Sequence, residues 1–177
     1  MSIPPDIRET VRQRAQFACE YCGVTETDTG GELTIDHFQP HTKGGTDVPE
    51  NLLYCCHRCN QYKANYWPVQ PQEPSLWHPQ HDPMERHLLL LADGTLYPIT
   101  DVGAFTLKRL RLNRPPLVAY RVRKQDDRAE HRLLARYREL VVVLERLHQQ
   151  QVALLEEQQL LLEEQRRLIH LLLRQQA

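Results

Sequence analysis

Hydrophobic positions in the first third of the chain recur at short and changing intervals, which predicts several short elements in place of one long one. Behind Pro4–Pro5, apolar residues follow helical spacing as far as Ala18, so a first helix is expected up to the first cysteine. Residues 32–38 alternate between apolar and polar positions, and residues 51–54 form a second short apolar run, so both are expected to be strands. A helix is expected from about residue 56 to 66, which gives the order strand, loop, strand, helix.

The middle of the chain changes to a proline-rich stretch followed by a hairpin pattern. Prolines recur between residues 67 and 82 and exclude a regular helix or central strand there, so an extended connection is expected. Residues 87–99 read as two short strands around Asp93–Gly94, because Asp-Gly supplies the positive backbone angles of a tight turn. A capped helix is expected over about residues 100–112, and Pro115–Pro116 begins another.

Beyond Asp126 the pattern becomes a heptad. Leucine occupies every seventh position: Leu133, Leu140, Leu147, Leu154, Leu161 and Leu168. The companion column four residues on is polar in its middle: Tyr137, Leu144, Gln151, Gln158, Gln165 and Leu172. An uninterrupted helix from here to the end would be about 75 Å long at about 1.5 Å per residue, and a coiled coil is the natural cover for its leucines. A single solvated helix is the alternative, and the number of helices in the coil stays open.

Composition indicates a soluble protein inside the cell. No stretch is long and apolar enough to span a membrane, and the start of the chain lacks a basic flank followed by an apolar run. We therefore expect a cytoplasmic location and no membrane partner. A chain of 177 residues can hold one compact domain with something appended, and at most two units.

Two Cys-x-x-Cys pairs are the first chemical signal: Cys19 with Cys22, and Cys56 with Cys59. In a reducing compartment such pairs are better explained by a metal than by disulfides. Four thiolates suit tetrahedral zinc and fill its coordination sphere, so we expect a structural zinc that clamps the core. Cys55 breaks the spacing and is expected to be a packed free thiol.

Asp36–His37 lies between the two cysteine pairs, and Asn51 and Asn60 follow. The oxygens of Asp36 and Asn60 are hard donors of the kind that Mg²⁺ prefers, and an imidazole titrates near neutral pH. Together with the cysteine pairs, these residues resemble the HNH endonuclease family in its variant with a four-cysteine zinc frame.

The resemblance implies a ββα-metal core and a metal-dependent endonuclease. It implies that Asp36 and Asn60 bind a catalytic divalent cation, Mg²⁺ or another, and that His37 is the general base that takes a proton from the attacking water. Asn51 matches the middle residue of the family motif, and its amide is expected to hold the loop and orient His37. The third named position, which is often histidine in the family, is here Asn60.

Positive charge gathers in one run although the net charge of the chain is −1. DNA is the expected partner, because phosphate affinity rests on lysine and arginine. Lys63 lies one helical turn after Asn60 and is a candidate phosphate contact. The other candidates form the basic run: Lys108, Arg109, Arg111, Arg114, Arg121, Arg123 and Lys124. His78, His81 and His87 are expected to be loop residues, since no carboxylate or cysteine stands at ligand spacing beside them.

These patterns predict an α+β protein of three parts: a zinc-stabilised nuclease core over residues 1–67, a hairpin and basic helical extension over residues 68–125, and a coiled-coil helix over residues 126–177. The expected function is hydrolysis of phosphodiester bonds in DNA, with a homo-oligomer or a partner protein held through the coil. One alternative is a non-catalytic zinc-containing module that binds nucleic acid, and another is a nuclease subunit active only with a larger partner. The sequence does not indicate which DNA sequence or structure is preferred, whether one strand or both are cut, or in which pathway the protein acts.

Overall fold

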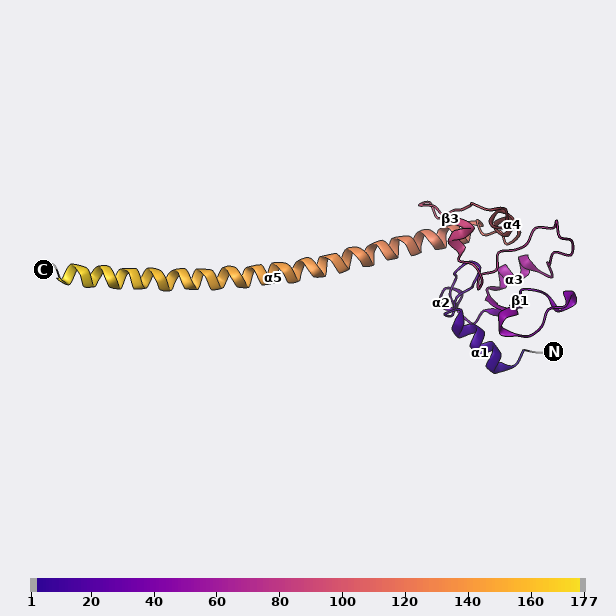
Figure 1. The fold of residues 1–177 in the computed structure, drawn as a ribbon, viewed down its shortest axis with the longest axis horizontal. Helices are drawn as coiled ribbons and strands as arrows, with labels where there is room; N and C mark the ends of the chain where they lie inside the picture. Colours follow the sequence, from indigo (N-terminus) through magenta and orange to yellow (C-terminus); the bar gives the residue numbers. More distant parts are fainter. Residues whose placement is uncertain (1–2, 176–177) are drawn as a thin grey trace. The chain divides into compact units, whose positions relative to one another are not determined.

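A computed structural model of the protein describes residues 3–175, with side chains as far as Ile169. The chain divides into two compact units, residues 1–125 (unit 1) and residues 126–177 (unit 2). Figure 1 shows their elements.

Unit 1 is a mixed α/β structure of short elements. Its helices are α1 (Pro5–Arg14), α2 (Glu26–Thr29), α3 (His57–Lys63), α4 (Asp101–Arg109) and the first residues of α5 (Pro115–Gln175). Its strands form two separate antiparallel hairpins, β1 (Thr34–His37) with β2 (Leu52–Cys55), and β3 (Leu88–Leu90) with β4 (Leu96–Pro98). Three-residue 3₁₀ turns lie at His41–Lys43, Pro49–Asn51 and Met84–Arg86. The predicted fold class, small antiparallel hairpins with helices and a long C-terminal helix, is confirmed.

The first hairpin lies between two helices. Strand β2 is buried along its whole length, and α1 contacts it, while α3 contacts β1. The register places Asp36 opposite Leu53 and His37 opposite Leu52. The last two residues of β1 are therefore held at the end of a buried hairpin, where the chain leaves for the long loop over residues 38–51.

Residues 68–125 share the core of the first hairpin. Trp77 is 4% exposed and packs edge-on against Tyr21, with ring centroids 6.3 Å apart. The backbone N–H of Trp77 donates to Thr106 Oγ1 at 2.8 Å, and Gln80 Nε2 donates to the carbonyl of Leu52 at 2.8 Å. The proline-rich connection is thus packed onto the first hairpin, and no separate core forms after residue 67 in the described part of unit 1.

Helix ends fall short of the predicted ones because the chain enters the left-handed region there. Gln16 and Phe17, just after α1, have φ of 52° and 59°; Ala64, after α3, has φ of 51°; and Arg111, after α4, has φ of 49°. The helical spacing of apolar residues continues beyond these residues. A prediction from this spacing alone therefore makes each helix a few residues too long. A right-handed helix cannot pass through a residue with positive φ.

Unit 2 contains the part of helix α5 that follows residue 125. The helix itself continues without interruption from Pro115 to Gln175. The two helices expected from Pro115 and from Asp126 are therefore one. The six leucines at every seventh position are between 52% and 59% exposed. Leu172, placed in the companion column by the sequence, lies outside the described side chains. No helix in the part of the chain that the structure describes is long and apolar enough to cross a membrane.

Candidate functional site

The four paired cysteines come together in unit 1. The Sγ atoms of Cys19, Cys22, Cys56 and Cys59 all lie within 4.8 Å of one another, and those of Cys22 and Cys56 are 3.7 Å apart. Hydrogen bonds from Cys19, Cys22 and Cys59 lower the pKa of the Cys56 thiol, so this thiol is the first to ionise. Four clustered and largely buried sulfurs fit a tetrahedral zinc ion, and Cys55 packs separately in the core.

Local backbone geometry positions both cysteine pairs. In the first pair the N–H of Gly23 donates to the carbonyl of Cys19 at 2.8 Å, and Gly23 adopts φ of 74°, which glycine reaches without strain. In the second pair Cys56 is the N-cap of α3, and its Sγ accepts from the N–H of Cys59 at 3.5 Å. Each pair thus forms a tight turn that directs two sulfurs to one point.

Arg114 completes the surroundings of the cysteine cluster. Its Nη2 lies 3.9 Å from Cys56 Sγ and 3.8 Å from Cys59 Sγ, and the side chain is partly buried. Four thiolates around one Zn²⁺ leave a net charge of −2, which a guanidinium offsets. Arg114 was predicted as a phosphate contact, and the structure brings it to the cysteines.

His37 faces the loop that follows β1. Its Nε2 lies 2.7 Å from Asp47 Oδ1, and Nε2 of His41 lies 2.8 Å from the same oxygen. The hydrogen bond from His37 is the main cause that lowers the pKa of Asp47. These three groups lie within 4.8 Å of one another and could also hold a metal ion. Sequence reasoning missed Asp47 and His41, because neither stands at a spacing that a local element would bring beside His37.

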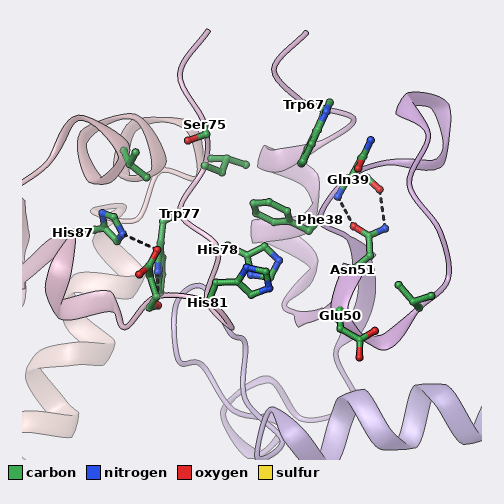
Figure 2. A pocket seen from close by; sticks show the side chains of 14 residues that line it. Phe38, Gln39, Glu50, Asn51, Trp67, Ser75, Trp77, His78, His81 and His87 are labelled. Carbon is green, nitrogen blue, oxygen red and sulfur yellow. Dashed lines mark hydrogen bonds and ion pairs between the residues drawn. The ribbon is translucent and has the colours of Figure 1, made fainter. Parts of the chain in front are cut away.

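Asn51 closes the loop between the strands, as Figure 2 shows. Its Oδ1 accepts from the N–H of Gln39 at 2.8 Å, and its Nδ2 donates to the carbonyls of Gln39 at 3.0 Å and Thr46 at 2.8 Å. Gly45 lies so close that an added Cβ would stand 1.7 Å from the Gln39 oxygen. The amide of Asn51 therefore ties Gln39 to Thr46, the residue directly before Asp47.

Asp36 and Asn60 lie on the side of β1 that α3 covers. Asp36 Oδ2 is buried, accepts no hydrogen bond within the described residues, and lies 3.1 Å from Lys63 Nζ. Burial raises the pKa of Asp36, and the Lys63 ammonium opposes this. Asn60 Nδ2 donates to Thr34 Oγ1 at 3.1 Å. The side-chain oxygens of Asp36 and Asn60 are hard donors of the kind that a divalent cation prefers, and in this structure the Lys63 ammonium is the charge partner of Asp36.

Lys63 occupies a different place from the predicted one. Its side chain is fully buried, and Nζ donates to the carbonyl of His37 at 2.6 Å beside the ion pair with Asp36. The sequence predicts that it lies on the same helix face as Asn60 and contacts a phosphate. Here the ammonium is an internal counterion that joins α3 to the end of β1.

The basic run divides into structural and exposed members. Arg121 is 8% exposed and donates to the carbonyls of Gly94 and Leu112, so its guanidinium is held inside unit 1. Arg109 donates to the carbonyl of Lys63 and lies over the ring of Tyr66. Lys124 pairs with Asp28 at 3.8 Å. The exposed members are Lys108, Arg111 and Arg123.

A ring-lined pocket of about 540 Å³ adjoins the loop that Asn51 holds. Phe38 packs against Trp67 and His78, and His78 stacks on His81 with ring centroids 3.9 Å apart (Figure 2). Burial, with the neighbouring His81 as a smaller cause, lowers the pKa of His78 to about 4, so this ring is neutral at pH 7. Of the described His, Cys, Asp and Glu residues, His78, His81 and His87 do not converge into a metal-binding group.

A zinc-fitting cysteine frame around a two-strand, one-helix unit, with Asp36–His37 at the strand end and Asn60 on the helix, is the arrangement that the sequence predicts for a ββα-metal core. Comparison with known proteins agrees, because residues 19–65 match the HNH endonuclease family. These residues form an HNH endonuclease domain, as the sequence predicted.

Two relatives extend the comparison. The chain is 44% identical over 54 residues to the CRISPR-associated endonuclease Cas9 of Corynebacterium diphtheriae, covering 30% of this chain and 5% of that protein. It is 27% identical over 138 residues to the Septu protein PtuA of Bacillus mycoides, covering 62% of this chain and 19% of that protein. The matches thus span less than a fifth of the length of either relative, and the second extends beyond the HNH domain.

Proposed function

We propose that this protein is an endonuclease that hydrolyses phosphodiester bonds of DNA with a divalent cation, and that His37 is its general base. The observation that carries the proposal is the hydrogen bond between His37 and Asp47 inside an HNH domain. A base needs a defined tautomer and a fixed ring, and both are supplied when one ring nitrogen is held by a carboxylate.

We infer from the hydrogen bond to Asp47 which ring nitrogen of His37 carries the proton. An ionised Asp47 accepts from Nε2–H, so the neutral ring carries its lone pair on Nδ1. No hydrogen bond reaches Nδ1 within the described residues, which leaves it available to an attacking water. His37 Nδ1 takes the proton of that water, and the imidazolium that forms is stabilised by the Asp47 carboxylate.

Asp36 and Asn60 would hold the divalent cation, which supplies Lewis-acid stabilisation of charge on the phosphate and on the leaving oxygen. The chain's own part in this is to present two oxygens from different elements, β1 and α3. The Lys63 ammonium opposes the rise that burial causes in the pKa of Asp36. The clustered cysteines would hold a structural zinc.

We assign DNA binding to the exposed cations Lys108, Arg111 and Arg123, of which Arg111 also lies over the ring of Tyr62. Contacts of this kind position the duplex and carry no base information, so binding should depend little on sequence and fall with salt. Arg114, Arg121 and Lys63 are excluded from this role, since their charges are engaged inside unit 1.

The test is conversion of supercoiled plasmid to nicked or linear form by the purified chain, with Mg²⁺ against EDTA. We expect cleavage by the native chain with Mg²⁺ only, and loss of cleavage in His37→Ala. His148→Ala, an exposed histidine of α5, is the matched control and should cut like the native chain. Absence of cutting by a folded, zinc-loaded native chain would refute independent nuclease action and favour a zinc-containing binding module.

A second candidate is a nuclease subunit that acts only with a larger partner. Two observations favour it: the partial match to the Septu protein PtuA, and the exposed leucine column of α5, which invites a protein partner. Here cleavage would appear only when the chain is copurified with that partner, and His37→Ala would abolish it in the complex as well.

A further inference from the structure

Helix α5 carries an apolar face wider than a single leucine column. In heptad terms the leucine column is d, and the companion column that starts at Tyr137 is a. Column e, one residue after each leucine, is also mostly apolar and exposed: Leu134, Val141, His148, Leu155, Leu162 and Ile169. Column g is polar or charged apart from Val143 and Leu171: Arg136, Val143, Gln150, Glu157, Glu164 and Leu171. An exposed face of this size requires a cover.

We propose that the cover is unit 2 of a second copy of this chain, paired in antiparallel orientation. The two flanks of the helix differ, and their difference decides the orientation. In a parallel pair of helices, residues at e meet residues at g of the partner, whereas in an antiparallel pair e meets e and g meets g. This proposal concerns assembly and does not depend on the nuclease activity.

A parallel pair would set apolar residues against charges. Leu162 would lie beside the partner's Glu157, and Ile169 beside the partner's Glu164. The glutamates would be desolvated without gaining a counterion, and the leucine and isoleucine would stay partly exposed to solvent. The antiparallel arrangement reduces both costs, because Leu134 and Val141 of the e flank meet the partner's Leu162 and Leu155. Two such contacts remain in it, Val143 beside the partner's Glu157 and Ile169 beside the partner's Asp127.

One antiparallel register satisfies the core and the charges together. With the twofold axis near residue 149, each core glutamine meets a leucine: Gln151 faces the partner's Leu147, Gln158 the partner's Leu140, and Gln165 the partner's Leu133. On the e flank Leu134 faces the partner's Leu162, and on the g flank Arg136 faces the partner's Glu164.

The charge order along the helix agrees with this register. Residues 128–138 hold four arginines and one glutamate, whereas residues 149–165 hold four glutamates and no basic residue. Two copies side by side in the same direction would align like with like. Reversing one copy in this register sets residues 128–138 against residues 160–170 of the other, where Glu163 and Glu164 are followed by Arg166 and Arg167.

Cross-linking of the full chain tests the orientation. All native cysteines lie in unit 1, so a cysteine placed in α5 reports on α5 alone. Gln150→Cys lies next to the twofold axis and should give a covalent dimer with a short bismaleimide. Gln158→Cys should not, because its two copies would stand about 27 Å apart along the axis at about 1.5 Å per residue. The native chain, treated alike, controls for reaction at unit 1.

Charge exchange tests the register. Arg136→Glu alone, or Glu164→Arg alone, should weaken dimerisation about tenfold by sedimentation equilibrium, because each creates two like-charge contacts per dimer. The double variant should recover native affinity. A monomeric native chain at micromolar concentration would overturn the proposal, as would any cross-linking of Gln158→Cys, or a double variant weaker than either single one.

Discussion

Replacing Lys63 by methionine gives the sharpest test of how the candidate site is held. The side chain of Lys63 is 0% exposed and that of Asp36 is 13% exposed, with Nζ and Oδ2 3.1 Å apart. At that distance two unit charges attract by about 5 kcal/mol if the effective dielectric constant is about 20. Desolvation cancels part of this attraction, but removing one partner leaves the other charge buried and unpaired, which costs about 3–5 kcal/mol.

We expect Lys63→Met to lose about 3 kcal/mol, at the low end because Asp36 keeps some contact with water and can take up a proton. For a chain of this size that loss lowers the melting temperature by about 10 °C. Methionine keeps the volume of the buried stem, so the loss reports on charge and not on a cavity. Thermal unfolding followed by circular dichroism on the zinc-loaded chain measures it, with the exposed Lys43→Met as control.

Magnesium adds a second arm to the same experiment. A divalent cation beside Asp36 can replace the missing ammonium, so Mg²⁺ should raise the melting temperature of Lys63→Met more than that of the native chain. If Lys63→Met is too unstable to purify, the double variant with Asp36→Asn should be recoverable, because it leaves no unpaired charge. Equal stability of Lys63→Met and Lys43→Met would refute the internal-counterion reasoning.

Three further changes follow from the loop and the pocket. Asp47→Asn should lower kcat of plasmid nicking about 10–100-fold with KM little changed, since His37 loses its orienting carboxylate; a change in KM alone would count against that role. Gly45→Ala must displace the facing loop segment, from which its Cβ would be only 1.7 Å away, and should reduce activity strongly, whereas Gly31→Ala, which meets nothing within 4 Å, should not. His78 has its pKa lowered from 6.5 to about 4, so the unfolded chain binds its proton first as pH falls. Its contribution, about 1–2 kcal/mol after solvent screening, should be present above pH 6.5 and lost toward pH 4, and urea titrations of His78→Gln should lack that part of the pH slope.

The HNH class and the order of the elements could be predicted because each rests on local signals. The cysteine spacing, Asp36–His37 and Asn60 are read directly from the chain, and Gly94 adopts φ of 80° at the tight turn that Asp-Gly predicted. These features are set by a few neighbouring residues, which is why a single sequence contains them.

The partners of charged side chains could not be predicted in the same way. Nothing near Lys63 in the sequence indicates that its ammonium is buried against Asp36, and Arg114 reaches the cysteines from a segment 55 residues after Cys59. Asp47 likewise reaches His37 only because Asn51 folds the loop back. Each of these contacts depends on how elements that are separate in the sequence pack against one another. Neither composition nor residue spacing contains this information.

The distance along the chain between Arg114 and the cysteines also has a consequence for synthesis on the ribosome. The last cysteine of the cluster leaves the ribosome 55 residues before Arg114 does. During that interval a zinc-loaded cluster would carry its excess negative charge without the guanidinium, and Trp77 would lack the Thr106 hydroxyl that accepts its backbone N–H. The HNH domain would therefore emerge early but reach its final stability only when the start of α5 has been made.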